Sequence, residues 1–297
     1  MTLGIWVRPG VPVCFRCRVG SVGCLGQRGQ GPFVARHDHV CWAYDEPREF
    51  HSAVGEFLAE GLTQRLRVCY VADGNPAALW EHLEDLGTSN RAAVQVLSIG
   101  ERYATGTVIE PVYQVQVFAA AMEEALAAGF LGLRVAADMT SLVRTPEQLD
   151  AVARYEHLVD RYMINKPLSG LCGFNKVELG EETVAQLACL HPTVNEDVTP
   201  FRLSASTCAA ASLSGELDAT SKNLFPMTLQ WADLRPTAGE LVIDASELTF
   251  IDHRSLIALA EYVQRWDARA VLLGHLPTAA RLIDILDLND VRVEVPT

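Results

Sequence analysis

The sequence predicts an α/β fold, a mostly parallel sheet covered on both faces by helices and followed by a smaller α/β unit. Two observations lead to this prediction. Between residues 37 and 193, five strand-like runs alternate with five helix-like runs, as crossover connections between parallel strands require. Near residue 199 the pattern changes, because two strand-like runs follow each other with no helix between them. A chain of 297 residues is long enough for two domains of ordinary size.

The elements of the first unit follow from apolar periodicity and from turn residues. Apolar side chains recur at helical spacing in the first helix, and Pro47 suits its first turn. A glycine closes the long third helix. The expected strands are 39–44, 67–73, 94–100, 131–139 and 168–174. The expected helices are 47–62, 76–87, 111–129, 146–163 and 181–191.

The second unit is expected to begin after the short polar segment 194–200. Its expected strands are 201–207, 208–217, 240–246, 270–274 and 291–295. Its expected helices are 219–234, 255–268 and 278–288. The predicted domains are therefore a disordered leader over 1–33, a first domain over 34–197 and a second over 198–297.

The cysteines fall into a leader group and a scattered group. Cys14, Cys17 and Cys24 look like half a zinc site, but no histidine or fourth cysteine follows at finger spacing. We therefore interpret the leader as a disordered tail, or as upstream sequence from a misassigned start. Cys69 and Cys172 lie inside strand-like runs and are expected to be small core residues. Reduced thiols, and the lack of a signal peptide or a long apolar run, predict a cytoplasmic protein.

The charge is unevenly distributed. The net charge is −13, yet the first 37 residues contain five arginines and no acidic residue. The remaining residues hold 19 basic and 37 acidic side chains, a net charge of −18. A body this acidic argues against a nucleic-acid partner, which needs a basic face. We expect no nucleic-acid and no membrane partner, and we attribute the acidity to solubility.

Ligands of parallel α/β sheets bind at the carboxyl ends of the strands. The chain has no GxxxxGK[ST] phosphate loop, and no GxGxxG follows a strand. The sequence therefore lacks the motifs that usually indicate nucleotide hydrolysis or dinucleotide binding. No cofactor is expected. The polar residues that reach this edge of the predicted sheet are Tyr44, Asp73, Glu101, Asp138 and Asn175.

Six segments in register carry a resemblance to a known family. They are His39-Val40-Cys41 with Tyr44, FLAEGL (57–62) with Asp73, GLRVAADMT (132–140), Arg154-Tyr155-Glu156, GLCGF (170–174) and LHP (190–192). Together, over residues 37–193, they resemble the MEDS domain, a sensory domain named from methanogen and methylotroph proteins. The resemblance implies a RecA/KaiC-type core without its phosphate loop. It also implies the sensing of a small organic, hydrocarbon-derived ligand.

His39 and Cys41 are two apart on one strand and so share a face. With His191 they could bind a metal or shape a ligand pocket. The favoured alternative is a satisfied core pair, because cysteine is so often buried, and no metal is assigned. Arg134 lies inside a strand and should pair with an acid such as Glu156 or Asp138. The predicted ligand-binding residues are His39, Cys41, Tyr44, Asp73, Arg134, Tyr155, Glu156 and His191.

The second unit resembles another family. LSGELDAT (213–220), followed after some 25 residues by LVIDASELTFID, is similar to the STAS domain of sulfate transporter tails and bacterial anti-sigma factor antagonists. In the antagonists the loop reads Asp-Ser-Ser/Thr-Gly-Leu, and the serine after the aspartate is phosphorylated. Here His253 occupies that acceptor position and Ser255 the glycine position. Asp218 and Asp252 are each expected to cap the helix that follows. The predicted partner-binding residues are Asp218, Asp252, His253, Arg254 and Ser255.

These observations predict a regulator that is not an enzyme. The first domain would sense a small organic ligand or another signal. The STAS domain would bind a protein partner such as an anti-sigma factor or kinase, without phosphorylation at the usual serine position. One alternative is a nucleotide- or metal-binding enzyme of degenerate RecA-like fold. Another is a scaffold that binds only proteins.

Overall fold

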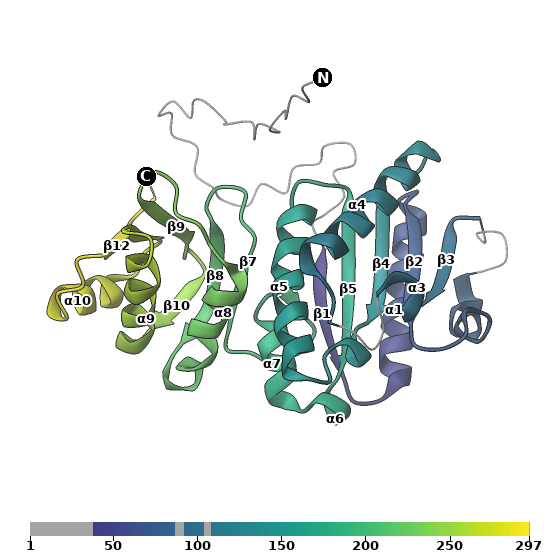
Figure 1. Cartoon of the computed structure of the whole chain (residues 1–297), viewed down its shortest axis with the longest axis horizontal. Coiled ribbons are helices and arrows are strands. Elements are labelled where there is room, and N and C mark those ends of the chain that lie inside the picture. Colours follow the sequence, from purple (N-terminus) through teal and green to yellow (C-terminus); the bar gives the residue numbers. More distant parts are fainter. Residues whose placement is uncertain (1–37, 87–91, 104–107, 297) are drawn as a thin grey trace, which may run out of the picture.

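Two sheets form the framework of the computed structural model, which describes residues 38–86, 92–103 and 108–296 (Figure 1). The first sheet is entirely parallel, in the order β3-β2-β4-β5-β1-β6. The five predicted strands are confirmed, and a short β6 is added beside β1. The bounds are β1 (His39–Tyr44), β2 (Arg67–Ala72), β3 (Val94–Ser98), β4 (Leu133–Asp138), β5 (Leu168–Asn175) and β6 (Thr193–Val194).

Helices cover both faces of this sheet. Helix α1 packs on one face, and α4, α5 and α7 lie over the other. The predicted helix 76–87 is wrong in its length, because a single α turn gives way to a 3₁₀ segment in which Leu83 is not helical. The helices are α1 (Pro47–Thr63), α2 (Pro76–Leu79), α3 (Ile99–Arg102), α4 (Pro111–Ala127), α5 (Pro146–Met163), α6 (Lys176–Leu179) and α7 (Glu181–Ala188).

The second sheet is mixed. Its path is β10-β8-β9-β11-β12, and β7 pairs antiparallel with β8, as the two adjacent strand-like runs predict. The bounds are β7 (Phe201–Ser204), β8 (Ala211–Leu217), β9 (Glu240–Asp244), β10 (Leu248–Ile251), β11 (Arg269–Leu273) and β12 (Val291–Glu294). The helices are α8 (Leu224–Ala232), α9 (His253–Gln264) and α10 (Pro277–Ile285).

One apolar core runs through both units. It extends from Cys41 and Val135 in the first sheet to Phe201 and Phe225 in the second unit. Helix α5 packs against α8, so it lies between the two sheets (Figure 1). A smaller core under α1 is separate from it. The two units therefore share buried apolar surface along α5.

Helix α5 places polar side chains in this shared core. It begins with a capping box between Thr145 and Gln148, as its sequence favours. Glu156 and Asp160 lie one turn apart and so on the same buried face. Among the described residues, no helix is both long and apolar enough to cross a membrane. The predicted leader, with Cys14, Cys17 and Cys24, lies outside the described residues.

Candidate functional site

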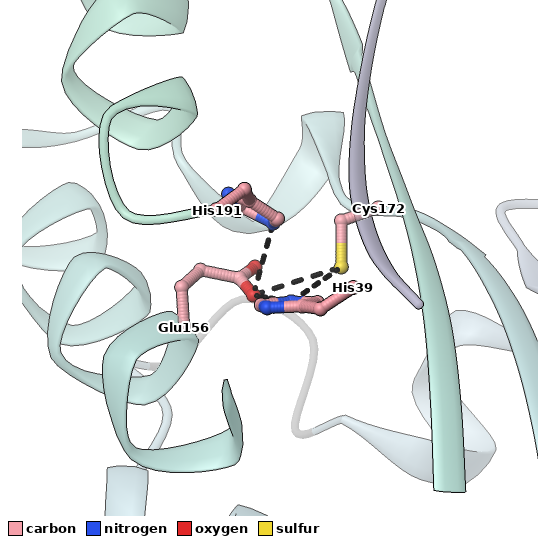
Figure 2. A group of neighbouring side chains, drawn as sticks. All are labelled: His39, Glu156, Cys172 and His191. Atoms are coloured by element: carbon pink, nitrogen blue, oxygen red, sulfur yellow. Dashed lines mark hydrogen bonds and ion pairs between the residues drawn. The ribbon is translucent and has the colours of Figure 1, made fainter. Parts of the chain in front are cut away.

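A buried polar cluster lies between the first sheet and the helices α5 and α7 (Figure 2). Four side chains converge in it: His39 from β1, Glu156 from α5, Cys172 from β5 and His191 just beyond α7. One donor atom from each lies within 4.8 Å of the others. Three of the side chains are fully buried, and Cys172 is 7% exposed. The donors therefore face one another with almost no access to water.

Strand pairing brings the sheet's part of this cluster together. In the register of β1 and β5, His39 lies opposite Gly170, and Cys41 lies opposite Cys172. A Cβ at position 170 would make ordinary contact with the His39 ring, at 3.5 Å, but would lie only 2.9 Å from the end of the Met163 side chain. The glycine therefore leaves space for Met163 beside the imidazole.

The carboxylate of Glu156 lies at the centre of the contacts. Its Oε2 atom is 3.2 Å from His39 Nε2, 3.6 Å from Cys172 Sγ and 3.5 Å from His191 Nε2. The Cys172 sulfur is 3.8 Å from His39 Nε2. The two histidine rings are close, with centroids 4.1 Å apart. Glu156 Oε1 is buried and has no hydrogen-bond partner in the part of the chain that the structure describes.

The outer nitrogen of each histidine has its own partner. His39 Nδ1 lies 3.1 Å from Asp160 Oδ1. His191 Nδ1 lies 2.9 Å from the carbonyl oxygen of Leu187. Since a carbonyl can only accept, His191 carries its proton on Nδ1 and turns the lone pair of Nε2 toward Glu156.

Burial and the nearby carboxylates set the charges in the cluster. Burial works against a charged His39, but hydrogen bonds to Asp160, Cys172 and Glu156 outweigh it, and the pKa of His39 is raised well above its usual value. Burial, with the charge of His39, lowers the pKa of His191 to about 4. Burial, with Glu156, raises the pKa of the Cys172 thiol to about 12. The directions of these shifts favour a protonated His39, a neutral His191 and a neutral thiol.

The structure brings His39, Glu156 and His191 together among the predicted ligand-binding residues. Cys41 is buried beside them but is not one of the converging donors, and Cys172 takes that place. The interpretation of Cys172 as merely a small core residue is therefore incomplete. Cys172 lies opposite Cys41 in the pairing of β1 and β5. The sequence could point to Cys172 only if these two strands were already known to be neighbours.

Arg134 pairs with acids, but not with the predicted ones. Its guanidinium lies 2.8 Å from Glu60 and 3.5 Å from Asp38, and it stacks over the Phe57 ring. The predicted pair of Arg134 with Glu156 is wrong, because the Arg134 side chain points to the face of the sheet that α1 covers. Glu156 approaches the sheet from the opposite face. The other predicted partner, Asp138, instead lies at the carboxyl end of the same strand.

At the carboxyl edge of the sheet, the side chains of Tyr44 and Asp138 form hydrogen bonds within the protein. Tyr44 donates to Asp138 over 2.9 Å, and Asp138 accepts from the backbone of Thr140 over 3.1 Å. Burial raises the pKa of Asp138, and the charge of the exposed Asp73 adds to this effect. Asn175 donates from its backbone to the Thr140 hydroxyl. Of the predicted edge group, Tyr44, Asp138 and Asn175 therefore meet around Thr140, whereas Asp73 is exposed and does not join them.

Two further predicted residues have local roles. Tyr155 is buried and meets the Tyr103 ring edge to face, with centroids 6.3 Å apart, so it packs within the core. Glu101 accepts from the backbone of Ser98 over 2.6 Å and completes the capping box of α3.

A shallow groove lies where the first turns of α4 and α5 meet. Its volume is about 540 Å³, and it is mostly apolar, with Ile109, Pro111 and Ala151 in its lining. Three charged residues of α5, Glu147, Asp150 and Arg154, also line it. Asp150 and Arg154 reach the second unit. Asp150 accepts from the indole N–H of Trp231 over 3.0 Å, and Arg154 donates to the backbone carbonyl of Gln230 over 3.3 Å.

The predicted partner-binding residues lie around two caps in the second unit. Asp252 accepts from the backbone of Ser255 over 2.8 Å and caps α9, as predicted. Asp218 accepts from the backbone of Thr220, but it caps a 3₁₀ turn over Ala219–Ser221, and α8 begins only at Leu224. His253 and Arg254 are exposed. Ser255 is only 2% exposed, and its hydroxyl has no hydrogen-bond partner among the described residues.

Comparison with known proteins places the first unit. A family model described as MEDS, the MEthanogen/methylotroph, DcmR Sensory domain, matches residues 38–192, slightly more than half of the chain. No curated protein matches the chain. The matched range covers the first sheet up to His191 and so contains all four side chains of the buried cluster.

Proposed function

The chain belongs to the MEDS family of sensory domains, and from that premise we propose that it is a two-part signalling regulator. Its first unit binds a small organic ligand, and its second unit, of STAS type, binds a protein partner. Binding of the ligand changes the affinity for the partner, which is a coupling free energy between two sites. The proposed function requires no catalysis.

The observation that carries this proposal is the position of α5, which contacts the groove and the second unit together. Within a turn of each other, Asp150 and Arg154 line the groove and bond to α8. Further along the helix, Asp160 Oδ2 accepts from the backbone N–H of Ala205 over 2.6 Å, just after β7. A ligand that moves Asp150 or Arg154 would therefore act directly on the second unit.

The lining of the groove points to the class of ligand. Apolar and proline side chains make up most of its wall, and the charged groups lie at a few positions. Small-molecule sites have this composition, with an apolar surface for affinity and a few polar groups for orientation. A small, largely apolar organic molecule is the ligand that fits.

The fold supports a RecA-type core that has lost nucleotide binding. In the parallel sheet β1 lies between β5 and β6, and its carboxyl end leads into α1. At that turn the chain carries Asp45 and Glu46 rather than a glycine-rich loop. Two acidic side chains there would repel the phosphates that a phosphate loop holds.

The second unit supports partner binding without phosphorylation of Ser255. An antiparallel β7–β8 hairpin is followed by parallel strands and by α9, which Asp252 caps. The buried Ser255 hydroxyl is closed to a kinase, whereas His253 and Arg254 are open to a partner such as an anti-sigma factor. Incubation with an anti-sigma kinase and ATP should leave Ser255 unmodified in mass spectrometry. Stoichiometric phosphate at this residue would contradict the proposal.

The ligand and its coupling are tested on the full-length chain. Calorimetric titration with dichloromethane and a panel of short-chain alcohols should reveal binding with a negative heat-capacity change, since apolar surface is buried. Ala151→Trp, which fills the groove, should abolish this binding. Flat titrations across the whole panel would count against sensing.

A matched pair of variants tests the route to the second unit. Trp231→Phe removes the N–H that reaches Asp150, so it should leave ligand binding intact but reduce the ligand dependence of partner capture several-fold. Trp266→Phe, at an exposed site in the same unit, should leave that dependence unchanged. Equal behaviour of the two variants would exclude this route.

A further inference from the structure

We propose that His39, Glu156, Cys172 and His191 form a closed zinc site, with His39 Nε2, His191 Nε2, the Cys172 sulfur and a Glu156 oxygen as the four ligands (Figure 2). This inference goes beyond ligand sensing, because it concerns a resident ion in the core of the first unit. It does not depend on whether the groove binds an organic molecule.

The distances between the donor atoms fit a tetrahedral ion. Zinc lies about 2.0–2.2 Å from nitrogen and oxygen ligands and about 2.3 Å from sulfur, so tetrahedral ligands lie about 3.3–3.6 Å from one another. Around Glu156 Oε2 the three measured separations are 3.2, 3.5 and 3.6 Å. The His39 to Cys172 separation is 3.8 Å. Four of the six donor separations are thus close to those of a tetrahedral site, and the other two, from His191 to His39 and to Cys172, lie within 4.8 Å, so the donors need to move only slightly to surround one ion.

The hydrogen bonds of His191 call for a cation at this centre. Its Nδ1 proton is committed to the Leu187 carbonyl, so its Nε2 presents a lone pair to the Glu156 carboxylate over 3.5 Å. Two acceptors that face each other in a dry site repel, and although Glu156 Oε2 has His39 and Cys172 as partners, His191 Nε2 lacks the donor that a buried polar atom requires. His191 Nε2 and Glu156 Oε1 have no hydrogen-bond partner within the described ranges. A metal ion between the donors satisfies His191 and Glu156 together.

The surroundings of the cluster match those of a metal site. Histidine ligands usually donate their other ring N–H to a carboxylate or a backbone carbonyl, which fixes the ring and its tautomer. His39 has Asp160 in this role, and His191 has Leu187. Both histidines therefore direct Nε2 inward, as two ligands of one ion must.

The donor set selects the ion and the kind of site. Two imidazoles, a thiolate and a carboxylate suit zinc, whereas magnesium and calcium prefer oxygen ligands alone. Four protein ligands with almost no exposure leave no open position for a substrate water, which is the mark of a structural zinc site. On binding, Cys172 loses its thiol proton and His39 Nε2 loses its own, and both protons pass to solvent.

Metal analysis of the purified full-length chain is the first test. Mass spectrometry of the digested protein should find one zinc ion per chain. Cys172→Ser and His191→Gln should each reduce that content at least tenfold. Cys69→Ser and His157→Gln replace a buried cysteine and a buried histidine of the same unit that lie outside the four, so they should retain the ion. Serine at Cys14, Cys17 and Cys24 should also retain it, which separates this site from the leader.

Cobalt substitution tests the ligands without any variant that could fail to fold. The wild-type chain loaded with Co²⁺ should show a thiolate-to-cobalt charge-transfer band and the strong visible bands of a tetrahedral ion. A wild-type chain with no zinc and no such spectrum at stoichiometric cobalt overturns the proposal. Zinc that survives Cys172→Ser but disappears with the leader cysteines overturns it as well. Neither readout depends on ligand or partner binding, so the proposed function stands or fails separately.

Discussion

At the scale of single residues, neighbours on α5 differ sharply in what surrounds them. Glu156 faces the cluster, whereas the next residue, His157, is fully buried and neither of its ring nitrogens has a hydrogen-bond partner within the described residues. A buried imidazole without a partner is costly, and more so when it is charged. Burial accordingly lowers the pKa of His157 to about 4.

Replacement of His157 by leucine should change how stability depends on pH. In the unfolded chain this histidine has a pKa of about 6.5, so below that pH the unfolded state binds the extra proton. His157 therefore does not reduce the free energy of unfolding above pH 6.5. As the pH falls from 6.5 toward 4, it lowers the free energy of unfolding by up to roughly 1.4 kcal/mol per pH unit. His157→Leu should match or exceed the wild type near neutral pH and lose less at acidic pH.

Urea unfolding of wild type and His157→Leu at several pH values measures this effect. The difference in the free energy of unfolding between the two proteins isolates His157 from other titrating groups, including His191. A difference that stays constant from neutral to acidic pH would show that His157 is not buried in its neutral form.

At the scale of elements, close packing of β5 against α1 depends on a glycine. A Cβ at Gly173 would lie only 2.4–2.8 Å from the ring of Phe50, so Gly173→Ala should force the ring or the strand to move. We expect a loss of about 1–3 kcal/mol in the free energy of unfolding, typical of overpacking. Gly55→Ala, inside α1 with no described atom within 4 Å of the new Cβ, should instead gain about 0.5–1 kcal/mol.

Thermal or urea unfolding of these two alanine variants checks the prediction. The same substitution should have opposite signs at the two positions, because one position is crowded and the other is an open helix site. A Gly173→Ala variant as stable as the wild type would mean that Phe50 does not pack against β5 as the structure shows.

Element boundaries were predictable where local chemistry sets them. Proline at the first turns of α1, α4 and α5 marks their starts, and Asp252 marks that of α9. The segment 76–87 has helical periodicity, but its α-helix ends after one turn. Arg134 was expected to pair with an acid, and it does, but its partner depends on which helix covers that face of the sheet.

At the scale of the whole molecule, the two units are joined by a common core rather than by a linker alone. The core cluster passes from the first sheet through α5 to α8 and the second sheet. Trp231 is largely buried at this junction and donates to Asp150. Such continuity predicts that the two units unfold together, because neither can lose its structure without exposing part of the other's core.

Trp231→Ala should weaken this coupling. The loss of a buried indole and its hydrogen bond should cost about 3–5 kcal/mol, and differential scanning calorimetry should then resolve two transitions in place of one. Trp266→Ala is the control, since this indole is 40% exposed and lies over Arg235 at the surface. A single transition with an unchanged midpoint in Trp231→Ala would mean that the shared core does not hold the units together.

The sequence by itself determined the order and type of most elements, the change of pattern near residue 199, the family of the first unit and the cap at Asp252. The elements and caps depend on residues close together in the chain, where periodicity, proline and capping side chains act, and the family depends on short motifs in a fixed order along the chain. It also marked His39, Glu156 and His191 as candidates. Only the tertiary structure decided that Cys172 joins them in place of Cys41, and that α5 contacts both units. The reason is physical: which strands are neighbours and which face a helix covers are set by packing between residues more than a hundred positions apart, such as His39 and Glu156.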